Sequence, residues 1–339
     1  MKSGVAATII IMSSILILMS MNSKALAHHG GVSAAFGPGA PVETSSPMTL
    51  KKGGFLIYEK VEVVPFKKFA FAEPENIDRY TFTNTLFGYG LRNDLSLYVS
   101  LPYAIKEQDT LGKSSGVGDP TIILQYGFKY GEREGFKGWY SFDEDDVAGK
   151  EYTQSDWKFG LQASMTIPAG NIHNKDNSGA TFPMGLQTGF GVPTYNFTAI
   201  VSKLVVPHLT LSMDTQFLTF SFAPGPDSGK PGNEWRLNGA LLYEIMENQG
   251  GFLSRMDIIG ETNFLYLTED LDENRAKILN TGGSILYLSP GLRLSFYDRA
   301  SLGVLVKFPT VKNLNNEDQQ QGAEGLEKYR AIATFSIGF

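Results

Sequence analysis

Apolar and polar residues alternate along most of the chain from Gly53 onward. The clearest stretch runs from Leu95 to Ile105, where every second residue is apolar and Ser96 and Ser100 are among the residues between. A period of two is typical of a β-strand with one face in an apolar medium and the other in a polar one. About twelve such segments follow one another, with almost no helical periodicity. Their approximate bounds are 53–64, 80–92, 94–105, 117–130, 156–168, 194–205, 208–221, 233–247, 253–267, 281–296, 300–309 and 328–339.

The last of these segments ends at the terminal residue, Phe339. From Tyr329 to Phe339 every second residue is apolar, and the residues between are polar or small apart from Ile332. A terminal aromatic residue on such a strand resembles the C-terminal signature of bacterial outer-membrane β-barrels. The resemblance implies that Phe339 is part of the signal read by the barrel-assembly machinery.

The lengths of the segments and of their connections favour a membrane barrel over a soluble all-β fold. Sandwich strands average about 5–6 residues, whereas most of these segments are longer, and no propeller-like repeat of about 40 residues is present. Counting back from Phe339, the short connections at 92–94, 206–207, 248–251 and 297–299 fall on one side. The longer connections at 65–79, 106–116, 169–193, 222–232, 268–280 and 310–327 fall on the other. Short periplasmic turns and long outer loops are typical of outer-membrane barrels.

One connection breaks this rule, because residues 131–155 would form a long periplasmic excursion. Two short strands hidden in 131–155 or 182–192 would raise the count to about fourteen. The sequence therefore predicts an all-β fold, a closed antiparallel transmembrane β-barrel over residues 53–339 with about twelve strands, and fourteen as the alternative.

The N-terminal residues predict export. Lys2 precedes an apolar run from Val5 to Met19, and Ala25-Leu26-Ala27 forms a cleavage site of the A-x-A kind. We interpret residues 1–27 as a signal peptide, with an uncleaved anchor as the alternative. Residues 28–52 are rich in Gly, Pro, Ser and Thr and lack a period, which predicts a flexible periplasmic arm. The sequence leaves open whether this arm is a plug in the barrel or a loose tail.

Composition restricts the function classes. The chain has no cysteine, which excludes disulfides, thiolate catalysis and cysteine-based metal sites. A net charge of −6 offers no basic surface for nucleic acid. Aromatic residues make up 12% of the chain, which suits the aromatic girdles of a membrane barrel. We expect no cofactor and no enzymatic activity.

Several Gly- and Pro-containing stretches resemble a known family of outer-membrane transporters, the MetA-pathway of phenol degradation family. The stretches are 37–44 before the first strand, 116–121 opening the fourth, 166–170 ending the fifth, 288–292 and 306–309. The resemblance covers most of the chain after residue 27. It implies a barrel in the outer membrane of a Gram-negative bacterium that passes aromatic or other small hydrophobic compounds.

Charged residues on the strands are the main candidate site. By the alternation they face the lumen, because Arg or Lys facing lipid at the midplane would cost about 2–4 kcal/mol. Inside, they either pair to brace the wall or line a pore. The candidate lumen-lining residues are Arg236, Glu244, Asp257, Glu261, Arg293, Lys307 and Arg330. Since a barrel of about twelve strands encloses a narrow space, we expect a narrow or plugged channel.

Weaker candidates each have an ordinary alternative. His28 and His29 at a free N-terminus could bind copper, nickel or zinc, or be a polar cleavage junction. His173, Asn174 and Ser178 resemble the residues of outer-membrane phospholipases but lie in a loop and depart from that family's His-x-Ser-Asn-Gly pattern. Acidic loop residues could bind calcium or bridge lipopolysaccharide through divalent cations, or be solvated. They are Asp143 to Asp146, Glu269, Asp270, Asp272, Glu273, Glu317 and Asp318.

The function these observations favour is a passive channel or transporter for small hydrophobic or aromatic solutes, whose partners are outer-membrane lipids, lipopolysaccharide and the assembly machinery. The alternatives are a structural barrel, an accessory to metal efflux that uses His28 and His29, and, third, an outer-membrane lipase.

Overall fold

The computed structural model describes residues 39–68, 77–131, 135–138, 157–182, 184–222, 229–248, 251–272, 274–279, 281–297, 299–315 and 326–339. The predicted signal peptide, residues 1–27, lies outside this part of the chain, as do His28 and His29. Within the described residues, no helix has the length and apolar character needed to cross a membrane.

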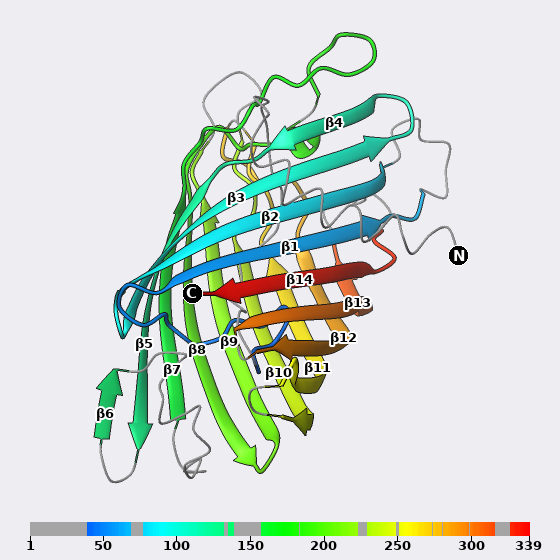
Figure 1. The fold of residues 1–339 in the computed structure, drawn as a ribbon. Coiled ribbons are helices and arrows are strands. Elements are labelled where there is room, and N and C mark those ends of the chain that lie inside the picture. The colour runs from blue at the N-terminus through cyan, green and yellow to red at the C-terminus, as the bar shows by residue number, and fades with distance from the viewer. Residues whose placement is uncertain are drawn as a thin grey trace.

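Twelve antiparallel strands close into a barrel with two short additional strands, which confirms the predicted fold (Figure 1). The ring runs β1-β2-β3-β5-β7-β8-β9-β10-β11-β12-β13-β14, and it closes where β14 pairs with β1. The ring strands are β1 (Phe55–Pro65), β2 (Ile77–Arg92), β3 (Leu95–Gln108), β5 (Thr121–Gly131), β7 (Trp157–Thr166), β8 (Thr194–Val206), β9 (Leu209–Phe220), β10 (Glu234–Glu247), β11 (Leu253–Leu267), β12 (Gly283–Phe296), β13 (Ala300–Leu314) and β14 (Arg330–Gly338).

The two additional strands account for the ambiguity between twelve and fourteen. The strand β4 (Gly112–Val117) pairs with the outer half of β3, and β5 then pairs with the inner half. Residues 118–120 stand opposite 101–102 of β3, so that β4 and β5 follow the same edge with a bulge between them. The strand β6 (Gly135–Gly138), within the long excursion at 131–155, pairs antiparallel with the end of β5. Instead of a strand, the 182–192 stretch contains a short 3-10 helix, η2 (Met184–Leu186).

The predicted register is confirmed for the strand with the clearest alternation. On β3, Ser96, Tyr98 and Ser100 are buried toward the lumen, while Leu101 and Tyr103 lie exposed on the outer face. The same outward exposure of large apolar side chains recurs around the ring. Since side chains alternate between the two faces, a shift of one residue would place the serines outside.

The seam between β1 and β14 runs along both strands, and its Phe339 end lies on the side of the short turns. The backbone N–H of Phe339 donates to the Phe55 carbonyl at 2.8 Å, and the Phe55 N–H donates to the Phe339 carbonyl at 3.1 Å. The side chain of Phe339 is 66% exposed on the surface. Its role as an assembly signal stays a prediction.

Candidate site inside the lumen

Residues 39–52 run inside the barrel, where the blue trace crosses the ring in Figure 1. We call this segment the strap. Residues 40–42 and 44–47 of the strap are buried. The lumen wall supplies hydrogen-bond partners for the backbone of this segment. Residues 28–38 lie outside the described part of the chain.

One carboxylate on β11 binds three successive backbone N–H groups of the strap. Glu261 accepts hydrogen bonds from the N–H groups of Val42 at 2.7 Å, Glu43 at 3.0 Å and Thr44 at 2.7 Å. It also accepts one from the Thr44 hydroxyl at 2.6 Å. A buried carboxylate needs such donors, and bonds to a charged acceptor are stronger than neutral ones. Glu261 is consequently the main anchor of the strap.

Other wall residues fix the strap further along. The carboxylate of Asp214 on β9 accepts the Ser45 N–H at 2.6 Å. The Gln125 amide donates to the carbonyls of Ser46 at 3.1 Å and Met48 at 2.7 Å. These bonds satisfy polar backbone that would otherwise be buried without partners.

Two lysines of the wall hold the acidic side chain of the strap. Glu43 lies 2.6 Å from the Lys60 ammonium on β1 and 3.4 Å from the Lys307 ammonium on β13. All three side chains are largely buried, with 12%, 8% and 3% of their surface exposed respectively. Nearby, Arg293 donates to the Pro41 carbonyl and, at 2.7 Å, to the Ser301 hydroxyl.

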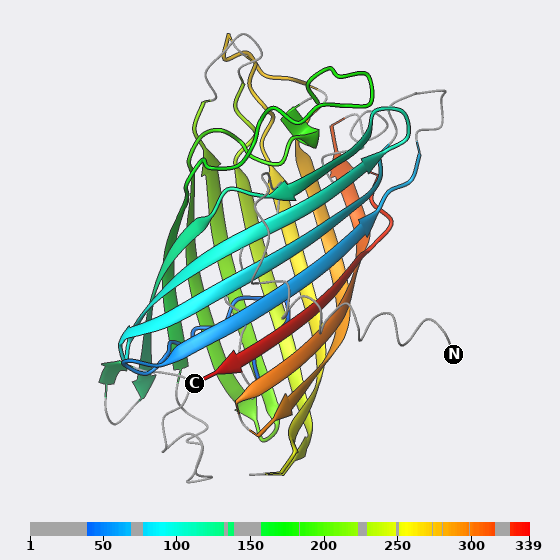
Figure 2. The same cartoon turned by 45° about the horizontal axis from the view of Figure 1, so that its top comes forward.

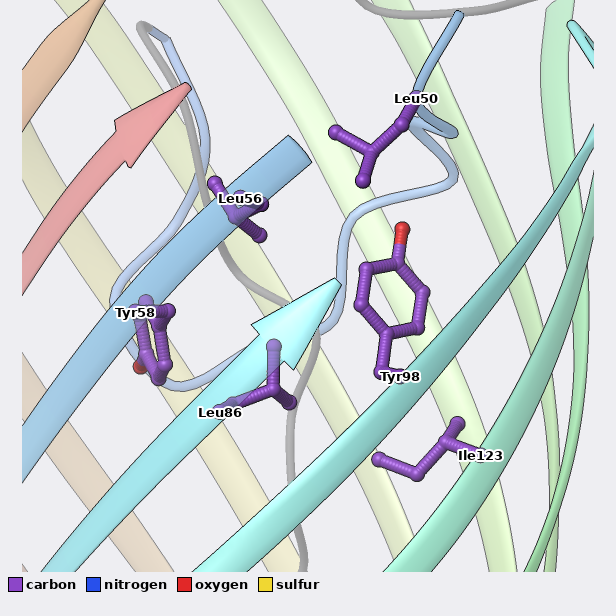
Figure 3. Packing of buried hydrophobic residues seen from close by; sticks show 6 residues of the cluster. All are labelled: Leu50, Leu56, Tyr58, Leu86, Tyr98 and Ile123. Carbon is purple, nitrogen blue, oxygen red and sulfur yellow. The ribbon is translucent and has the colours of Figure 1, made fainter. Parts of the chain in front are cut away.

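Apolar contacts accompany these polar ones. Leu50 of the strap packs among Leu56, Tyr58, Leu86, Tyr98 and Ile123 of the wall (Figure 3). At the other end of the strap, Val42 packs among wall residues that interrupt the polar inner pattern. They are Ala240, Leu242, Ile259, Leu305 and Ile332. The apolar wall residues of these two clusters therefore lie against the strap.

Inward-facing glycines make room for the strap. A β-carbon on Gly90 would lie 1.9 Å from the carbonyl oxygen of Lys51, and one on Gly160 would lie 2.9 Å from the α-carbon of Pro47. On Gly303 it would lie 2.9 Å from Val42. Glycine within a strand weakens it and often marks a close approach by another backbone. The wall is therefore shaped around the strap.

A long loop between β7 and β8 covers the other mouth of the barrel, at the top of Figure 2. Lys106 of β3 donates to the carbonyls of Gly185 at 3.0 Å and Gln187 at 2.6 Å. Phe182 and Leu186 pack into an apolar cluster with inward-facing wall residues such as Tyr80. The loop is thus anchored by both polar and apolar contacts.

The structure brings the candidate lumen-lining residues onto the inner face. Asp257, Glu261 and Arg293 are at most 2% exposed, while Lys307 and Arg330 are at most 6% and Arg236 is 9% exposed. Most of them form ion pairs. The Arg236 guanidinium lies 2.6 Å from the Glu234 carboxylate. The Arg330 guanidinium lies 2.9 Å from Glu62 and 2.8 Å from Glu327.

Glu244 lies near the short-turn end of β10. It pairs with Arg255 at 2.9 Å and contacts His208 at 2.8 Å. Arg255 also pairs with Asp257 at 2.7 Å. This group braces the inner wall and touches the first residue of the strap, since a β-carbon on Gly39 would lie 3.0 Å from Cζ of Arg255.

The loop candidates have local partners. The Ser178 hydroxyl donates to Asp176 at 2.6 Å, which lowers the pKa of that carboxyl below its ordinary value. Asn174 donates its side-chain amide to the Ser114 hydroxyl at 2.9 Å, and the His173 N–H donates to Asn171 at 2.8 Å. The side chains of Ser178 and Asn174 therefore stabilise the loop.

The acidic loop residues also have local partners. Glu269 pairs with Lys277 at 3.1 Å, Asp270 accepts the Gly232 N–H at 2.6 Å, and Asp272 accepts the N–H groups of Asn274 and Ala276 at 2.9 and 2.8 Å. No group of potential metal ligands occurs among the described residues. The remaining candidates, 143–146, 273 and 317–318, lie outside them.

The fold is that of an outer-membrane β-barrel. The COG4313 outer membrane channel from Pseudomonas putida F1 superimposes with a TM-score of 0.61 at 14% identity, over 88% of this chain and 100% of that one. A deletion mutant of the TodX monoaromatic hydrocarbon channel scores 0.44 at 10% identity, covering 87% and 93% of the two chains. The NanC porin scores 0.42 at 10% identity, covering 82% and 98%. The two lower scores add nothing to the assignment. No protein-family model and no curated protein sequence matches the chain.

Proposed function

We propose that the protein is an outer-membrane channel for passive passage of small solutes, whose lumen is closed by the strap. The observation that carries the proposal is that the strap, and not only side chains of the wall, occupies the lumen. The lumen of a small barrel can be filled by side chains of its own wall. Here the wall carries glycines at Gly90, Gly160 and Gly303, and the strap backbone occupies the space they leave.

The contacts of the strap suit a segment that leaves and returns. Its backbone is held by side chains, chiefly Glu261, Asp214 and Gln125, and it adds no strand to the sheet. Its release would leave the twelve-stranded ladder intact, because the ladder bonds do not involve it. The solute gradient would then drive passage.

The solute class that we propose is small and hydrophobic or aromatic. An apolar cluster of Leu265, Leu267, Ile285 and Tyr287 lies on the inner wall. Charged side chains stand beside it, with the Lys307 ammonium 4.6 Å from the centre of the Tyr287 ring. Such a wall suits an apolar solute with one polar end. We further propose that the chain belongs to the MetA-pathway of phenol degradation family, which its Gly- and Pro-containing stretches resemble. We also propose that the predicted signal peptide directs its export and that the protein resides in the outer membrane.

Planar-bilayer recording tests this function. The purified protein should give discrete current steps when the strap opens, and phenol should interrupt the open current. Glucose at the same concentration is the control. It is small but strongly polar, so it should not interrupt the open current. Absence of current steps from a correctly folded barrel would instead support the structural, non-transporting alternative.

A further inference from the structure

The two lysines that hold the strap also form a potential binding site for a soluble anion. Glu43 belongs to the strap, whereas Lys60 and Lys307 belong to the wall. Among the described residues, Glu43 is the one carboxylate within ion-pair distance of Lys307. If the strap leaves, Lys307 loses that partner inside the lumen, and an unpaired cation there is costly.

The charge of the surrounding cluster defines the charge of the ligand. The wall contributes four cations, Lys60, Arg236, Lys307 and Arg330, and three carboxylates, Glu62, Glu234 and Glu327. With Glu43 the cluster contains four cations and four carboxylates. When the strap leaves, these ion-paired groups lose one negative charge, which a monoanion at the lysines replaces.

The surface beside the lysines defines the body of the ligand. The Tyr287 ring lies against Lys307, and Leu265, Leu267 and Ile285 pack around it on the inner wall. A molecule with a carboxylate at the lysines would extend its remaining atoms over this apolar surface.

We propose that Lys60 and Lys307 bind the carboxylate of a small monocarboxylate with an apolar body, which competes with Glu43 and thereby loosens the strap. This rests on the proposed channel function, for which it names a substrate class and a means of opening. The carboxylate of the solute replaces that of the strap, so the lysines never lack an anion.

A thiol reporter on the strap follows this competition in the full-length protein. The chain has no cysteine, so Ser46→Cys gives a single label site, and residue 46 is 3% exposed in the closed state. Sodium benzoate and sodium hexanoate should each speed maleimide labelling several-fold. Sodium acetate lacks the apolar body and benzyl alcohol lacks the charge, so neither should do so. Equal effects of benzoate and benzyl alcohol would overturn the proposal.

Variants locate the site by calorimetric titration with benzoate. Glu43→Gln should tighten benzoate binding about tenfold, because the competing carboxylate is removed. A tenfold change in affinity corresponds to about 1.4 kcal/mol. Lys307→Met should abolish binding, and Lys307→Arg, which keeps the charge, should retain it. The matched control is Glu59→Gln, beside Lys60 but on the outer face of β1, and should leave binding unchanged. Benzoate binding that survives in Lys307→Met would refute the site.

The two proposals fail separately. If a barrel without the strap conducts ions but no variant binds benzoate, the anion site is wrong and the channel function stands. If benzoate binds as expected but no preparation conducts, the protein is a carboxylate-binding barrel and the channel function is wrong.

Discussion

Replacing Glu261 by glutamine should free the strap while the barrel stays folded. In the structure this carboxylate accepts four hydrogen bonds from Val42, Glu43 and Thr44. Glutamine keeps one acceptor oxygen and turns an NH₂ group toward the two remaining donors. Two bonds to a charged acceptor are then lost, and each contributes about 1.5–3 kcal/mol. The docking of the strap should weaken by roughly 3–6 kcal/mol, or about 10²–10⁴-fold in its equilibrium.

The assay is the rate at which maleimide labels Ser46→Cys in the presence and absence of Glu261→Gln. When opening and closing are faster than labelling, the rate follows the open fraction, so it should rise by at least about a hundredfold. Glu247→Gln, an exposed carboxylate at the end of β10, is the control and should not change the rate. A rise of less than about threefold in a folded barrel would refute the role of Glu261 as the main anchor.

Three further changes test other parts of the structure. Gly90→Ala should displace the strap and raise Ser46→Cys labelling, whereas Gly260→Ala, which meets open space, should not; equal rates would count against the glycine cradle. Leu97→Arg should destabilise the barrel in lipid by about 2–4 kcal/mol in urea titrations, and a neutral effect would contradict the outward register. Deleting Phe339 should lower the amount of barrel in the outer membrane on blots, and wild-type levels would argue against the assembly signal.

The sequence was sufficient for the barrel because each strand carries its own period of two. On β3 and β14 the alternation alone places the outer and inner faces. It was less sufficient at residues 118–120, where a bulge separates β4 from β5. There the predicted strand at 117–130 included one residue of β4, although Gly118, Asp119 and Pro120 form a turn-forming sequence between the two strands.

The strap could not be placed from its own residues. It has no period, and its partners are far along the chain, since Val42 and Glu261 are 219 positions apart. The signal lay instead in the wall. Ile332 is the apolar exception of the last strand, and glycines such as Gly90 stand within strands, where they cost stability. Both features are explained by contact with the strap.

The charged residues were easier to predict than their partners. Alternation shows that Arg236 and Lys307 face inward, because the outer face has to be apolar. It does not show that Arg236 pairs with Glu234 two residues away or that Lys307 meets Glu43 from the strap. Pairing depends on the register between strands and on the path of the strap, and neither is local in sequence.

The central claim is that the strap closes a channel, and single-channel conductance tests it most directly. The comparison is between the intact protein and a variant that keeps the signal peptide but lacks residues 28–50, both reconstituted in planar bilayers at the same salt concentration. The account predicts rare openings for the intact protein and a long-lived open state of higher conductance for the deletion variant. Equal conductance and open time in the two proteins would contradict it.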